Sequence, residues 1–193
     1  MSKVIAWLLC GVLLAAPAVH ADERLALEAT TAREPPTTYV NLRLGGSTSS
    51  RRAELCGEVA PHWRVSVEGC GSGREFLHHE ANPELAHFRA KFTFTRLRTA
   101  LGWLEPRAAL GFAEFQLGAD DPGFDFTSVN RTRTATSGPE AGAALRWSVP
   151  VVAGFELLVE MNVSLAVFAF APLLETPQAV LQPSASVSAG VGF

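Results

Sequence analysis

The sequence contains few lysine, tyrosine and methionine residues, and after its first twenty positions it has no long hydrophobic run. Only 18% of the 193 residues are charged, whereas 48% are hydrophobic, and so large an apolar share excludes an intrinsically disordered chain. A membrane-spanning helix needs about 18 or more consecutive apolar residues, so none is expected beyond position 20.

A concentrated basic patch is also lacking. The formal net charge is −3 and the arginines are scattered along the chain, so the electrostatic footprint of a nucleic-acid-binding protein is missing and no nucleic-acid partner is expected. The 16 glycines, 12 prolines and 12 phenylalanines favour strands and turns over helices.

The first 21 residues have the composition of a cleavable signal peptide. Lys3 supplies a positive start, an apolar stretch runs from Val4 to Ala16, and small residues precede a cleavage point after Ala21. Residues 22–36 are polar and end in two prolines, which predicts a short N-terminal tail. Residues 37–193 are then expected to form one domain.

A period of two dominates this domain, and it places alternate side chains on opposite faces of a strand. In residues 86–95, Phe88, Phe92 and Phe94 share one face, while Arg89 and Lys91 share the other. The pattern predicts an all-β fold with eight strands, at residues 37–46, 52–60, 62–71, 84–97, 105–118, 138–149, 154–168 and 179–193.

The lengths of the connections favour a barrel, and the placement of the aromatic residues distinguishes a transmembrane barrel from a soluble sandwich. Short and long connections alternate, which is typical of an eight-stranded antiparallel up-and-down barrel with tight turns at one end. A soluble β-sandwich would bury the apolar faces, whereas a transmembrane barrel turns them toward lipid. Five aromatic residues are expected at the short-turn end, which favours an interfacial girdle and the transmembrane barrel: Tyr39, Trp63, Trp103, Trp147 and Phe193.

With its signal peptide, eight alternating segments and a last strand that ends in Phe193, the chain resembles the small eight-stranded outer-membrane β-barrels of Gram-negative bacteria, the OmpA/OmpX kind. The resemblance implies an outer-membrane location, contact with outer-membrane lipid and lipopolysaccharide, and recognition of the last strand by the barrel assembly machinery. We expect no peptidoglycan-binding domain after the barrel, unlike in some members.

In a barrel of this kind the polar faces line the lumen. A lumen of eight strands is only wide enough for side chains to fill it, so we expect an ion-pair network that plugs the barrel. The expected members are Arg43, Glu54, Glu58, Arg64, Glu68, Arg89, Lys91, Glu114, Glu140, Arg146, Glu156 and Glu160. Arg96 falls on the lipid-facing side near the short turns, where its side chain could extend to the interface.

The two cysteines beyond the signal peptide, Cys56 and Cys70, share the inward face of neighbouring strands. In an oxidising compartment they could form a disulfide. A turn near Pro61 and His62 would instead place Cys56 opposite Val67, so the pattern leaves the bond open.

The sequence favours a structural or surface-interaction role through the loops over an enzyme. His78, His79 and Glu80, followed by His87, match no zinc-protease spacing, and we expect no catalytic residue, metal or cofactor. A lipid A-modifying enzyme and a small pore are the alternatives, and the surface ligand and the oligomeric state stay open.

Overall fold

The computed structural model describes residues 39–49, 53–72, 84–117, 134–152 and 154–193. All of them lie within one compact unit, Pro36–Phe193. Among these described residues, no helix has the length and apolar character needed to cross a membrane. The predicted signal peptide and N-terminal tail fall outside the described residues, and they stay predictions.

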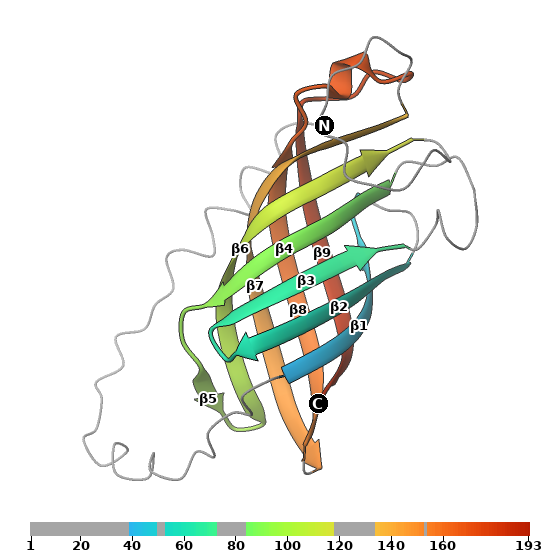
Figure 1. Ribbon diagram of the computed structural model, residues 1–193. Helices are drawn as coiled ribbons and strands as arrows, with labels where there is room; N and C mark the ends of the chain where they lie inside the picture. Colours follow the sequence, from blue (N-terminus) through green and yellow to red (C-terminus); the bar gives the residue numbers. More distant parts are fainter. Residues whose placement is uncertain (1–38, 50–52, 73–83, 118–133, 153) are drawn as a thin grey trace, which may run out of the picture. The chain divides into compact units, whose positions relative to one another are not determined.

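The described residues form a closed antiparallel sheet (Figure 1). Consecutive strands pair with each other except β4 and β5, and the pairings of β1 with β9 and of β4 with β6 close a barrel of eight strands. The short β5 forms a hairpin with the first residues of β6 and is not one of the eight strands of the barrel. The strands are β1 Tyr39–Ser47, β2 Ala53–His62, β3 Val65–Gly71, β4 Glu84–Thr93, β5 Leu97–Thr99, β6 Gly102–Gln116, β7 Ala135–Val152, β8 Phe155–Val167 and β9 Leu181–Gly192. The predicted fold class, an all-β up-and-down barrel of eight antiparallel strands, is confirmed.

The two ends of the barrel differ in their connections. One end carries the β2–β3 turn, the β5–β6 hairpin and the β7–β8 turn, together with Tyr39 and Phe193, and we call it the turn end. The opposite loop end receives the ends of β1, β3, β6 and β8 and carries the 3-10 helix η2, Ala171–Leu173 (Figure 1). At the turn end Gly154 has φ of 86°, a conformation that side-chain-bearing residues rarely adopt.

The β2–β3 turn lies further along the chain than the sequence pattern predicted. The expected connection at residues 60–62 is part of β2, which has an irregularity between Val59 and His62. The turn itself consists of Trp63 and Arg64. A bulge of this kind adds residues to one strand without ending it, so strict alternation places the turn too early.

On most strands the apolar face points outward, as predicted for a transmembrane barrel. Phe88 and Phe92 on β4 and Leu157 on β8 are about half exposed, while Arg89 and Lys91 are buried in the lumen. The same alternation recurs on β1, β7 and β9.

The faces of β6 were predicted wrongly. The expected lumen position of Glu114 implies that the odd-numbered Ala109, Ala113 and Phe115 face outward, but they are buried inside, and Leu110 and Phe112 face outward instead. The register explains this, because Ala113 lies opposite the inward-facing His87 of β4. Apolar residues occupy both faces of this strand, so composition alone did not distinguish the two.

An apolar cluster fills the lumen at the loop end. It joins inward-facing residues of β4, β6 and β8 to the β8–β9 connection, with the Phe115 and Phe168 rings 5.9 Å apart. The connection is fastened by its own hydrogen bond, in which the Gln178 N–H donates to the Ala171 carbonyl over 3.0 Å. The members are Leu85, Ala113, Phe115, Ala166, Phe168, Ala171 and Leu174. The lumen is therefore apolar at the loop end and charged between this cluster and the turn end.

Candidate functional site: the charged lumen

Charged side chains from seven strands meet in the middle of the barrel. Each sits at an inward position of its strand, and β9 contributes the small Ser184, Ser188 and Gly190 on that face, which leaves room for the longer side chains. We call this set the lumen network: Arg43 of β1, Glu58 of β2, Glu68 of β3, Arg89 and Lys91 of β4, Arg107 of β6, Glu140 and Arg146 of β7, and Glu160 of β8.

Glu160 is the centre of this network. Its carboxylate accepts hydrogen bonds from Lys91 Nζ at 2.5 Å, Arg107 Nη1 at 2.9 Å and Arg146 Nε at 2.9 Å. Arg43 Nη1 donates a fourth. Four cations from four strands therefore converge on one carboxylate that is fully buried.

Glu58 and Glu68 extend the network on either side of Arg43. Arg107 Nη2 lies 2.6 Å and Arg43 Nη2 3.0 Å from Glu58, which also pairs with Arg146. Glu68 pairs with Arg43, with Lys91 Nζ at 2.5 Å and with Arg89 Nη2 at 2.8 Å. Each of these carboxylates therefore contacts three cations.

The network becomes less dense toward the loop end. There Arg89 Nη1 lies 3.5 Å from Glu140, and His87 Nδ1 is 2.9 Å from the same carboxylate. His87 is thus a buried lumen residue, opposite Cys70 of β3. The predicted cluster partners His78, His79 and Glu80 lie outside the described residues.

This arrangement can neutralise charge, but it leaves no described carboxylate of the network available for another ligand. Glu58, Glu68 and Glu160 are close enough together to hold a metal ion. Their oxygens, however, already accept from Arg43, Lys91, Arg107, Arg146 and Arg89, so an ion would have to displace these cations. Removing one partner from such a buried set would leave an uncompensated charge in the lumen.

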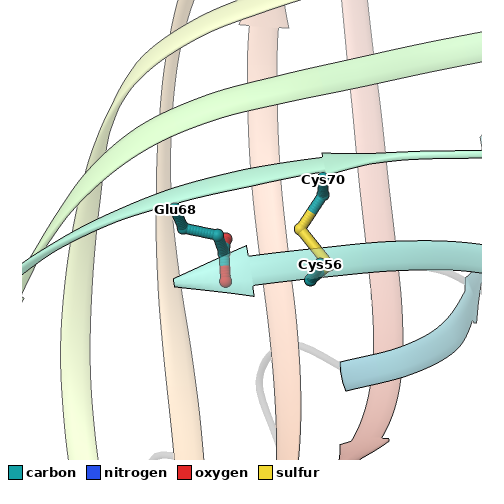
Figure 2. Close-up of side chains that lie close together, drawn as sticks. All are labelled: Cys56, Glu68 and Cys70. Carbon is teal, nitrogen blue, oxygen red and sulfur yellow. A yellow bond between two sulfur atoms is a disulfide. The ribbon is translucent and has the colours of Figure 1, made fainter. Parts of the chain in front are cut away.

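A disulfide joins the two predicted cysteines above the network. Cys56 of β2 lies directly opposite Cys70 of β3, with the Cα atoms 4.1 Å apart, and their sulfurs are bonded (Figure 2). Glu68 lies beside the bond, two residues before Cys70 on the same face of β3 (Figure 2). The later turn at Trp63 and Arg64 produces this register, whereas the expected turn would have paired Cys56 with Val67.

A second, smaller group of charges lies at the turn end. Arg96, in the β4–β5 connection, is 2.8 Å from Glu105 and 3.4 Å from Glu156, and its guanidinium is 4.9 Å from the Trp103 ring centre. The Tyr39 hydroxyl donates to Glu156 over 3.4 Å. Glu156 therefore lies inward, as predicted, but outside the lumen network. Arg96 joins an ion-pair cluster instead of the lipid interface.

Besides Glu156, three other predicted members of the network lie elsewhere. Glu54 faces inward near the loop end and accepts from the Ser47 hydroxyl. Arg64 belongs to the β2–β3 turn, is exposed, and stacks on the Trp63 ring at 4.5 Å. Glu114 is buried on β6, but its register opposite Ala86 places it on the outward-facing side.

Sequence analysis missed Arg107 and Glu105. Both lie on the inward face of β6, which had been assigned outward. Arg107 uses its whole guanidinium, since Nε donates to Thr93 Oγ1 at 3.2 Å while both terminal nitrogens reach Glu58. Arginine is rare on a lipid-facing surface, so Arg107 was itself the signal for the opposite assignment.

The five predicted girdle aromatics all lie at the turn end, but they do not all face outward. Trp147 and Phe193 are on outward positions, and the Phe193 ring is 6.1 Å from that of Phe155. Trp63 is in the turn. Tyr39 and Trp103 have inward register, and the Tyr39 ring covers Gly192, where an added Cβ would come within 1.8 Å of the hydroxyl.

Comparison with known proteins gives a limited result. No protein-family model matches the chain, and no curated protein matches it. Among solved structures, the chain is similar to the N-terminal β-barrel domain of OprF from Pseudomonas aeruginosa, with 13% sequence identity and a TM-score of 0.45. The match covers 81% of this chain and 96% of that domain.

The fold and the described residues of the lumen together define a class of protein. The chain is a closed eight-stranded antiparallel β-barrel whose middle is filled by buried ion pairs and whose loop end is filled by apolar side chains.

Proposed function

We propose that the protein is a transmembrane barrel of the bacterial outer membrane, with a structural or surface-interaction role carried by its loop end. The inverted distribution of polarity supports this location. Large apolar side chains such as Leu110, Phe112 and Met161 are about half exposed or more around the outside, whereas arginine, lysine and glutamate side chains are buried inside. A soluble barrel of the same fold would present the opposite distribution.

The predicted signal peptide, residues 1–21, supports the same location because it would export the chain. The alternation of the last strand up to Phe193 is consistent with recognition by the barrel assembly machinery. Outer-membrane lipid would contact the apolar belt, and lipopolysaccharide would surround the loop end.

A filled lumen favours a non-conducting barrel over a pore. Passage of a hydrated ion would require breaking several buried ion pairs around Glu160 at once, in addition to moving the apolar cluster at the loop end. An enzymatic role has no described site to support it, because the described lumen carboxylates are all paired and His87 lies inside the barrel.

Substitution by arginine on the outside tests the membrane location. Val187 is 54% exposed on an outward position in the middle of β9. Val187→Arg should destabilise a membrane barrel by about 2–4 kcal/mol, because the charge enters the bilayer midplane. The matched control is Leu173→Arg, which changes a 66% exposed residue of η2 at the loop end and should be nearly neutral.

The measurement is urea unfolding in lipid vesicles, read from the gel mobility of heated and unheated samples, alongside fractionation of cells. Equal tolerance of both substitutions, or recovery of the folded protein in the soluble fraction, would contradict the proposal.

A further inference from the structure

The Cys56–Cys70 disulfide is enclosed on every side that the lumen offers. Both cysteines point inward, with 5% and 6% of their surfaces exposed. On the turn side lie Glu68 and Arg89, whose Nη2 is 3.8 Å from the Cys70 sulfur. His87 lies beside Cys70, directly opposite it on β4, and the apolar cluster that includes Leu85 lies toward the loop end.

Enclosure limits the chemistry that can make or break this bond. Thiol–disulfide exchange requires a thiolate to reach one sulfur of the disulfide that it attacks, and its rate falls when access is lost. An eight-stranded barrel filled by side chains offers no path for another molecule. A reagent as large as an enzyme's redox loop cannot reach either sulfur while the strands are paired.

Early formation of the bond would also select the strand register. The sequence allows a turn near Pro61 and His62, which would place Cys56 opposite Val67, whereas the observed turn places it opposite Cys70. The difference of three residues is odd, so the slip would exchange the inward and outward faces of one strand. The bond between residues 14 apart permits only the observed pairing.

We propose that Cys56 and Cys70 are oxidised before the barrel closes, by a disulfide-carrying thiol oxidoreductase acting on the unfolded or hairpin-stage chain. One cysteine thiolate attacks the oxidant's disulfide to form a mixed disulfide and release one oxidant thiolate. The second cysteine thiolate then displaces the other. The two thiols of the chain lose two electrons and two protons, and the oxidant leaves as a dithiol. The inference goes beyond the proposed role at the loop end and does not depend on it.

The test compares oxidation of the closed and open states. The purified protein is reduced, refolded in detergent micelles without oxidant, and then given oxidised glutathione, while a second sample is kept unfolded in urea. Remaining thiols are counted by alkylation with a polyethylene-glycol maleimide and gel shift. The folded barrel should be oxidised at least about 100-fold more slowly than the unfolded chain, because exchange must await opening.

The control moves the cysteine pair to an open position of the same hairpin. His62 and Val65 are directly opposed at its tip and both are exposed. In the Cys56→Ser/Cys70→Ser background, His62→Cys with Val65→Cys should be oxidised in the folded barrel within about tenfold of the unfolded rate.

Each result decides the proposal. Slow oxidation of the folded natural pair beside fast oxidation of the control supports it, as does failure of the reduced chain to close at all. If the control does not fold, reduction of the oxidised natural protein by glutathione replaces it, and the folded form should again react at least about 100-fold more slowly than the unfolded form. A closed, reduced barrel that is oxidised as fast as the unfolded chain would overturn the proposal.

Discussion

Replacing Glu160 by glutamine should show how much the barrel depends on its buried charges. Glu160 accepts hydrogen bonds from Arg43, Lys91, Arg107 and Arg146. Glutamine has nearly the same shape, so the substitution removes the charge without leaving a cavity.

The magnitude follows from the charges that remain. The lumen network contains five cations, Arg43, Arg89, Lys91, Arg107 and Arg146, and four carboxylates, Glu58, Glu68, Glu140 and Glu160. Glu160→Gln leaves five cations facing three carboxylates, and removing one partner of a buried ion pair typically costs about 3–5 kcal/mol. We expect a loss of this size in the free energy of unfolding.

A double-mutant cycle separates the pairwise interaction from general damage. Lys91 Nζ is 2.5 Å from Glu160, and Lys91→Met removes that cation while keeping an unbranched apolar side chain. Urea unfolding in lipid vesicles is measured for each single variant and for Glu160→Gln/Lys91→Met. The double variant should be more stable than the sum of the two single losses by about 1–3 kcal/mol.

The matched control is Arg98→Met on β5. Arg98 is exposed and has no carboxylate partner among the described residues, so the change should stay within about 0.5 kcal/mol. Losses below about 1 kcal/mol for Glu160→Gln, or additive effects in the cycle, would refute the view that the network is buried and mutually compensated.

Three other predictions follow. Arg89→Ala removes the only arginine paired with Glu140 among the described residues and leaves that carboxylate with hydrogen bonds to His87 and Ser164, so it should destabilise the barrel by about 3–5 kcal/mol. Planar-bilayer recordings should still show no large stable openings, and such openings in the natural protein would contradict the plug. Arg96→Ala should cost only about 1 kcal/mol in urea unfolding, since its ion pairs at the turn end are partly exposed to water; a loss as large as that for Glu160→Gln would contradict this distinction. Protease added to intact cells should cut residues 118–137 before residues 101–105, and the reverse order would show that the loop end faces the periplasm.

The period-two pattern predicted the fold because it is imposed by the strand itself. Alternation places Arg89 and Lys91 on one face and Phe88 and Phe92 on the other, whatever the neighbouring strands are. The eight strands of the barrel and their order could therefore be predicted, as could most members of the lumen network, although not which of them pair. The disulfide could not, because register depends on a bulge between Val59 and His62 that leaves no alternating signal.

The errors in the predicted lumen have two physical causes. Arg64 lies in a turn, where the backbone no longer directs side chains alternately to the two faces. Its place in the alternating pattern therefore did not indicate whether it faces the lumen. The other cause is β6, where both faces carry apolar residues. Leu110 and Phe112 face outward, while Ala109 and Phe115 face the lumen.

Assigning β6 from its most apolar stretch reversed the whole strand, because a period of two admits only two assignments. That single reversal removed Glu105 and Arg107 from the lumen and added Glu114 to it. The apolar residues that misled the assignment near the loop end are the ones that fill the lumen there, since Phe115 and Ala113 belong to the buried cluster. The interior thus changes from charged to apolar along one strand, and alternation of polarity marks the inward face only where the interior is charged.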